Sequence, residues 1–105
     1  MQTAAVSPWV DVMLARINMQ GGKEVMMDGS REEVEAVLRT ARANGKAIIG
    51  MKIFGEGRLA EHRDACMQYA QGNGLLDAMT IGFHTPNQID DVLRLMHKYP
   101  AKAVV

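Results

Sequence analysis

Three apolar runs divide the chain at regular intervals and predict three β-strands. The middle run is almost unbroken, so the strand that it predicts has apolar residues on both faces. Such a strand needs cover on both sides, which is typical of a parallel sheet in an α/β protein. Gly45 precedes this run, and the turn Gly55-Glu56-Gly57 follows it. The three expected strands span Val10–Ile17, Ala47–Phe54 and Ala78–Phe83.

A helical pattern follows each expected strand. Ser30, with Glu33 three residues later, predicts the N-cap and capping box of a first helix, which Gly45 ends. A second helix is expected from about Leu59 to Gln71. The first helix should bury Val34, Val37, Leu38 and Ala41, and the second Leu59, Cys66, Tyr69 and Ala70.

A third helix is predicted near the end of the chain. Thr85 is its expected N-cap, Pro86 occupies the first helical position, and Gln88 completes another capping box. Pro100 ends the pattern, and Gln2–Val6 resembles the tail of a further helix before the first strand. The residues of the third helix expected to point inward are Ile89, Val92, Leu93 and Met96.

Strands that alternate with helices predict right-handed crossovers and a parallel sheet, in one α/β domain over residues 1–105. Three strands are few for such a sheet, because the first and third would both be edges with unpaired backbone groups. We therefore expect the chain to be part of something larger. One alternative is a noncatalytic α/β module that associates with itself through these open sheet edges.

Charge and composition exclude several classes of protein. Twelve basic residues balance twelve acidic ones, so no net charge attracts nucleic acid or an anionic membrane. No stretch resembles a membrane span or a signal peptide. Cys66 is the only cysteine, which excludes an internal disulfide and fits a reducing compartment; we expect a cytoplasmic protein with a buried thiol. The histidines and Cys66 lack metal-ligand spacing, so no metal site is expected.

Three segments together resemble the C-terminal part of an aldo/keto reductase, over roughly residues 7–98. Trp9–Asn18 resembles the sixth strand of that family, and Ile48–Gly57 the seventh strand and its loop. Asp77–Asp91 resembles the eighth strand with its helix-opening Ser/Thr-Pro-x-Gln segment. The resemblance implies a βαβαβα segment from the end of a (β/α)8 TIM barrel. It also implies an oxidoreductase that transfers hydride between NAD(P)H and a small carbonyl substrate.

The resemblance places the nicotinamide and pyrophosphate contacts at the seventh strand. The catalytic Tyr, Asp, Lys and His of the family come from early strands that have no counterpart here, so the chain is expected to be inactive alone. Met51 takes the place of an aromatic ring that often stacks on the nicotinamide. Lys52, Phe54 and Gly55 fall where the strand end approaches the cofactor. Backbone amides from Gly55 to Gly57 and the Arg58 side chain are expected near the pyrophosphate.

The adenosine end is expected at the eighth strand, around Gly82, Phe83, His84 and Thr85. Gln88 and Asp91 take the positions that face the ribose and adenine. Leu14 replaces a carboxamide-binding Gln, and the family's usual basic residue for a 2′-phosphate is absent, so the choice between NADP and NAD stays open. A third possibility, besides the reductase segment and the self-associating module, is a fragment of another phosphate-binding barrel, whose C-terminal loops hold a substrate phosphate.

Overall fold

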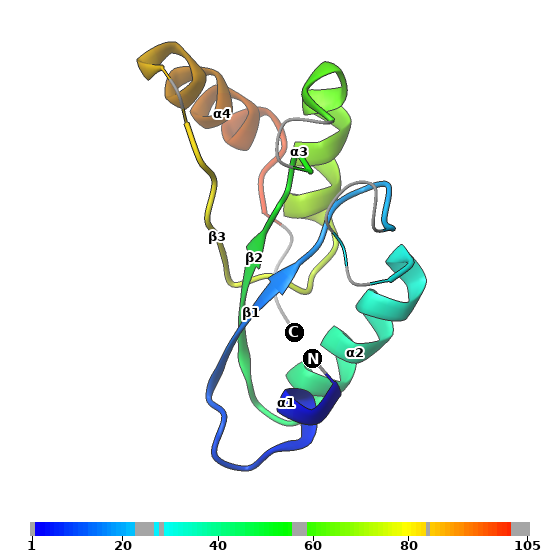
Figure 1. Ribbon diagram of the computed structural model, residues 1–105. Helices are drawn as coiled ribbons and strands as arrows, with labels where there is room; N and C mark the ends of the chain where they lie inside the picture. Colours follow the sequence, from blue (N-terminus) through cyan, green and yellow to red (C-terminus); the bar gives the residue numbers. More distant parts are fainter. Residues whose placement is uncertain (1, 23–26, 28, 56–58, 84, 102–105) are drawn as a thin grey trace.

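The computed structural model describes residues 2–22, 27, 29–55, 59–83 and 85–101, and these residues confirm an α/β arrangement. Helices and strands alternate along the chain as predicted (Figure 1). The helices are α1 (Gln2–Val6), α2 (Arg31–Ala43), the short 3₁₀ helix η2 (Ala60–His62), α3 (Arg63–Gly72) and α4 (Pro86–Lys98). The strands are β1 (Val12–Arg16), β2 (Ala47–Met51) and β3 (Ala78–Met79).

The three strands form one parallel sheet in the order β1-β2-β3. Val12 of β1 lies opposite Ala47 of β2, and the register runs on to Arg16 opposite Met51. On the other side of β2, Ile49 lies opposite Ala78. Neighbouring parallel strands end at the same rim of a sheet, so the loops after β1, β2 and β3 all leave from that rim.

Helices α2 and α3 lie on the same side of the sheet (Figure 1). Burial along β1 alternates accordingly, because Met13 and Ala15 are buried while Val12 and Leu14 are 50% and 57% exposed. The sequence predicts cover on both faces, but the described residues cover only one. The other face, here called the open face, carries Val12, Leu14, Ala47, Ile49, Met51 and Ala78.

Two apolar clusters hold these layers together. The larger lies between the sheet and α2, where Leu38 and Ile48 are fully buried. The smaller joins α3 to α4 through Met67, Val92 and Leu95. Each fully buried side chain of this size contributes about 1.5–3 kcal/mol relative to exposure. Because α4 packs mainly along α3, it stands beyond the strand ends and beside α3 (Figure 1).

All three strands are shorter than the sequence predicts. β2 stops at Met51 because Lys52 adopts a left-handed backbone conformation (φ 60°), which breaks the extended pattern. β3 is then limited to two residues, and Thr80 N, directly after it, donates to Gly50 O (2.9 Å). Beyond that point β2 offers no further extended partner.

The predicted caps of α2 and α4 are confirmed. Ser30 Oγ accepts a hydrogen bond from Glu33 N (3.2 Å), and Thr85 Oγ1 accepts one from Gln88 N (3.4 Å). The Glu33 carboxylate accepts from the Ser30 hydroxyl (3.2 Å). Gly45 follows α2 with φ 79°, as expected for a C-terminal glycine.

The prediction for the second helix is wrong at its start, and that for the third is wrong in part of its buried face. α3 begins at Arg63 because the preceding turn is a 3₁₀ helix, in which His62 N donates to Leu59 O (2.9 Å). On α4, Ile89 and Leu93 are 43% and 50% exposed, whereas Leu95 is fully buried. Helix α4 packs against α3 instead of lying flat on the sheet. A different set of its side chains is therefore buried from the one predicted.

Candidate functional site

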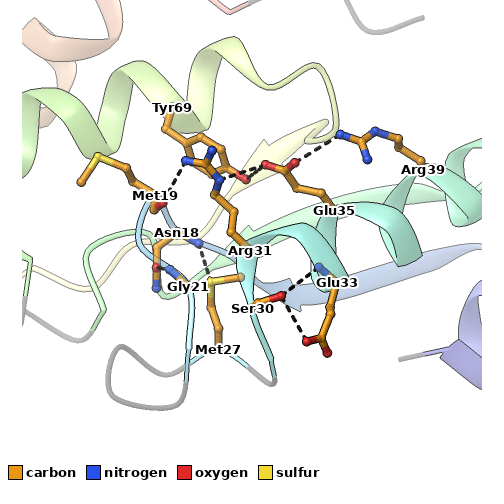
Figure 2. Close-up of polar contacts among 10 residues, drawn as sticks. All are labelled: Asn18, Met19, Gly21, Met27, Ser30, Arg31, Glu33, Glu35, Arg39 and Tyr69. Carbon is orange, nitrogen blue, oxygen red and sulfur yellow. Dashed lines mark hydrogen bonds and ion pairs between the residues drawn. The ribbon is translucent and has the colours of Figure 1, made fainter.

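The loops after β1 and β2 are joined at the sheet rim by Asn18, which is 1% exposed. Its Nδ2 donates to Lys52 O (3.2 Å), and its Oδ1 accepts from Gly21 N (2.9 Å). Its backbone N donates to Met27 Sδ (3.2 Å), so the loop folds back over the end of β1 (Figure 2). The sequence signal for this role is a polar residue directly after an apolar strand.

Lys52, at the same rim of the sheet, has a strained backbone conformation. It is the non-glycine residue with positive φ in the described part of the chain, and it follows directly after β2. A left-handed non-glycine residue costs roughly 1–3 kcal/mol and persists only where its surroundings hold it. Asn18 Nδ2 and Gly55 N both donate to Lys52 O, which supplies that restraint. Because such strain gathers at functional sites, the end of β2 is the candidate site.

A polar network fastens the loop after β1 to α2 and α3 (Figure 2). Arg31 Nη1 donates to Met19 O (3.1 Å), and the Arg31 guanidinium lies 5.2 Å from the centre of the Tyr69 ring. The Tyr69 hydroxyl donates to Glu35 Oε1 (2.7 Å), and Glu35 also pairs with Arg31 and Arg39. Burial first, and Glu35 second, raise the pKa of Tyr69, so its hydroxyl stays a donor.

The sequence prediction did not include this network among the site residues. The signal for part of it was present, since Arg31, Glu35 and Arg39 are spaced four residues apart on one helix face. Tyr69 was expected to point inward, and it is half-buried against the larger cluster.

The predicted cofactor positions at the end of β2 have different surroundings. Met51 is partly exposed on the open face, opposite Arg16 of β1. Phe54 packs against both the larger and the smaller apolar cluster and against a third, formed by Leu59 and Cys66, so its ring holds the fold together at this rim. Gly55 is buried, adopts φ 58°, and donates its N–H to Lys52 O (2.9 Å). Gly57 and Arg58 lie outside the described residues.

The predicted adenosine positions lie around the start of α4. Gly82 and Phe83 are exposed, as are Thr85 and Gln88. The Thr85 hydroxyl is used as the helix cap. His84 lies outside the described residues.

Asp91 makes two ion pairs, one that joins α4 to α3 and one within α4. Its Oδ2 lies 2.7 Å from Arg63 Nη1, and its Oδ1 lies 2.9 Å from Arg94 Nη2. The carboxylate is only 20% exposed. Both oxygens therefore have cationic partners within the fold.

Cys66 is fully buried, as predicted, and burial raises the pKa of its thiol to about 11. Its Sγ points to Leu59 O at 3.9 Å. Among the described residues, no three His, Cys, Asp or Glu side chains come together as a metal site requires. In the same part of the chain, no helix has the length and apolar character to cross a membrane.

Comparison with protein-family models, with curated proteins and with solved structures finds no match for this chain. The structural class of the protein therefore rests on its own fold. It is an α/β protein whose described residues form a three-stranded parallel sheet, covered on one face by α2 and α3.

Proposed function

We propose that this chain is the cofactor-side segment of an NAD(P)H-dependent oxidoreductase of the aldo/keto reductase type. The observation that carries the proposal is the parallel order β1-β2-β3, which brings the loops of adjacent strands to one rim. Ligands of parallel α/β proteins bind at such rims. The strained Lys52 at the end of the central strand supports the same location.

Only some of the predicted cofactor-binding residues have surroundings that would allow them to contact a dinucleotide. Met51 fits, because a partly exposed thioether on the open face is free to lie against a flat ring. Thr85 and Gln88 fit as exposed residues at the start of α4. Gly55 and Asp91 fit less well, since the amide of the first and the carboxylate of the second already have partners.

In this function the chain binds and orients the cofactor. The nicotinamide supplies hydride when bound, and the remainder of the barrel supplies the proton donor. Met51 limits the space beside the nicotinamide ring, and Lys52 adds positive charge at the rim for an anionic ligand. Asn18 holds Lys52 in its left-handed conformation through its bond to Lys52 O.

Titration calorimetry of the 105-residue chain with NADPH, NADH and a simple sugar phosphate tests the proposal. We expect saturable binding of at least one dinucleotide and no carbonyl reduction by the chain alone. Preferential binding of the sugar phosphate would favour another phosphate-binding barrel. Binding of none of the three, or turnover by a pure preparation of this chain, would overturn the proposal.

Two substitutions locate the site. Met51→Glu places a negative charge beside the expected cofactor and should weaken dinucleotide binding at least about tenfold, equivalent to 1.4 kcal/mol. Val6→Glu is the matched control, because Val6 is 64% exposed on α1, which lies at the opposite end of the molecule from the C-terminal ends of the strands. Equal weakening by both variants would contradict binding at the rim.

A further inference from the structure

The two edges of the sheet differ in length. β3, at one edge, has two residues, and very short edge strands resist pairing with other chains. β1, at the other edge, has five residues, Val12–Arg16, without proline, glycine or lysine. Within the described part of the chain, β1 has a strand neighbour on one side only. Apart from the charged Arg16 at its end, β1 therefore lacks the usual devices that protect an edge strand.

The hydrogen bonds to β2 show which groups of β1 face outward. Ala47 N donates to Asp11 O, and Ile17 N donates to Met51 O, each at 3.0 Å. In a parallel ladder these bonds and the register direct the N–H and C=O of odd-numbered β1 residues toward β2. The N–H and C=O of Val12 and Leu14 therefore point to the outer edge, while their side chains lie on the open face.

We propose that two copies of this chain pair β1 with β1 in antiparallel orientation, about a two-fold axis that passes at Met13. An edge that pairs with its own copy about a two-fold axis must do so antiparallel. In this register Val12 lies opposite Leu14 of the second copy, and Leu14 opposite Val12. Each pair exchanges two backbone hydrogen bonds, because the outward-facing residues meet each other. The result is a six-stranded sheet with one continuous open face.

The chemistry of the edge favours a second copy as the occupant. Val12 and Leu14 are 50% and 57% exposed, and pairing brings their side chains together across the two strands. The register keeps the charged Arg16 away from the axis. The chain also has no net charge, so two copies do not repel each other strongly. In a barrel completed as proposed above, a preceding strand would occupy this edge, so the pairing concerns the 105-residue chain on its own. It does not depend on cofactor binding, which is proposed for the strand ends.

Sedimentation equilibrium over micromolar to millimolar concentrations tests the pairing. We expect the mass to rise from the 11.5 kDa of one chain toward twice that value, because a small interface gives a weak dimer. Leu14→Lys should raise the dissociation constant about tenfold, since the substitution removes two cross-strand pairs at once. Leu93→Lys is the matched control, with 50% exposure on α4, and it should leave the constant unchanged.

Circular dichroism establishes that each variant is folded, and Val12→Lys replaces Leu14→Lys if the latter is not. A monomer at every concentration, a dimer insensitive to both β1 variants, or equal loss in the Leu93 control would each overturn the pairing.

Amide hydrogen exchange separates edge pairing from any other dimer. The amides of Met13 and Ala15 face β2, so they should exchange slowly at every concentration. The amides of Val12 and Leu14 should become protected only as the dimer forms. A dimer in which these two amides exchange as fast as in the monomer would rule out the β1 pairing.

Discussion

Asp77 provides the acceptor that starts the pairing between β2 and β3, and its replacement by alanine should destabilise the sheet. Its Oδ2 accepts from Ile48 N and from Arg42 Nη1, both at 2.8 Å. Its own N–H donates to Ile48 O, also at 2.8 Å. The carboxylate thus takes the place that a strand carbonyl would have one residue earlier. Its removal leaves Ile48 N, in the central strand, without that acceptor.

The expected loss follows from these two contacts. An unsatisfied backbone amide costs about 1–3 kcal/mol, and a partly exposed ion pair such as Asp77–Arg42 contributes about 0.2–1 kcal/mol. The Asp77 side chain is 37% exposed, so water compensates part of the loss. We expect Asp77→Ala to lower the free energy of unfolding by about 2 kcal/mol. Asp77→Asn keeps an acceptor for Ile48 N and should cost about half as much.

The loss of stability caused by replacing Asp77 should also depend on pH. The Ile48 amide, and then Arg42, lower the pKa of Asp77 in the folded protein. A carboxylate with a lowered folded-state pKa stabilises the fold fully above its unfolded pKa of about 3.9. That stabilisation is lost as the pH falls through the lower folded value. The difference in stability between the unsubstituted chain and Asp77→Asn should therefore shrink at acid pH.

Urea denaturation followed by circular dichroism at several pH values measures these differences. Asp64→Ala is the control, because Asp64 is paired with Lys98 (2.9 Å) where both side chains are 52% exposed. That variant should unfold at the same urea concentration as the unsubstituted chain. An Asp77→Ala protein as stable as the unsubstituted one would refute the reasoning, since it would mean that water replaces the carboxylate completely.

Three further predictions concern other positions. Gly21 and Gly45 have nearly equal φ values, 80° and 79°, but a Cβ on Gly21 would lie 2.5 Å from Arg31 N, whereas one on Gly45 meets no atom within 4 Å. In urea denaturation, Gly45→Ala should cost about 1 kcal/mol and Gly21→Ala clearly more; equal losses would contradict this. Lys46, 6% exposed, donates to two backbone carbonyls at 2.6 Å each, so Lys46→Met should cost about 2 kcal/mol by the same measurement, and an unchanged midpoint would count against it. The buried thiol of Cys66, with its pKa raised to about 11, should react with a disulfide reagent at pH 8 only as fast as the protein unfolds, and rapid reaction of the native chain would exclude the burial described.

The features that the sequence predicted correctly are those set by local chemistry. Ser30 and Thr85 cap their helices because each side chain reaches a backbone amide three residues away. Cys66 is buried because of its place on the apolar side of a helix. The alternation of helices and strands was sufficient to predict the parallel sheet, since crossovers of this length leave few other arrangements.

The errors arise where distant segments meet. The end of β2 before Lys52 depends on Asn18, which lies 34 residues earlier and donates to the Lys52 carbonyl. Ile89 and Leu93 are exposed because α4 packs on α3, and no periodicity within α4 specifies which neighbour it meets. Asp91 fits a cofactor position by sequence alone, whereas the fold pairs it with Arg63 of α3. At the candidate site, the sequence therefore predicted which strand ends share a rim but not the partners of the residues there.

By itself, the sequence determined the order of the elements, the parallel class of the sheet and the positions of the caps, because these depend on periodicity and on contacts within a few residues. Only the tertiary structure decided that the described residues cover one face of the sheet and leave the other open, and that within them β1 presents Val12 and Leu14 at a sheet edge. The physical reason is that a strand with apolar residues on both faces has the same sequence pattern whether one or both of those faces are packed. Which face is covered depends on where the crossover helices come to rest.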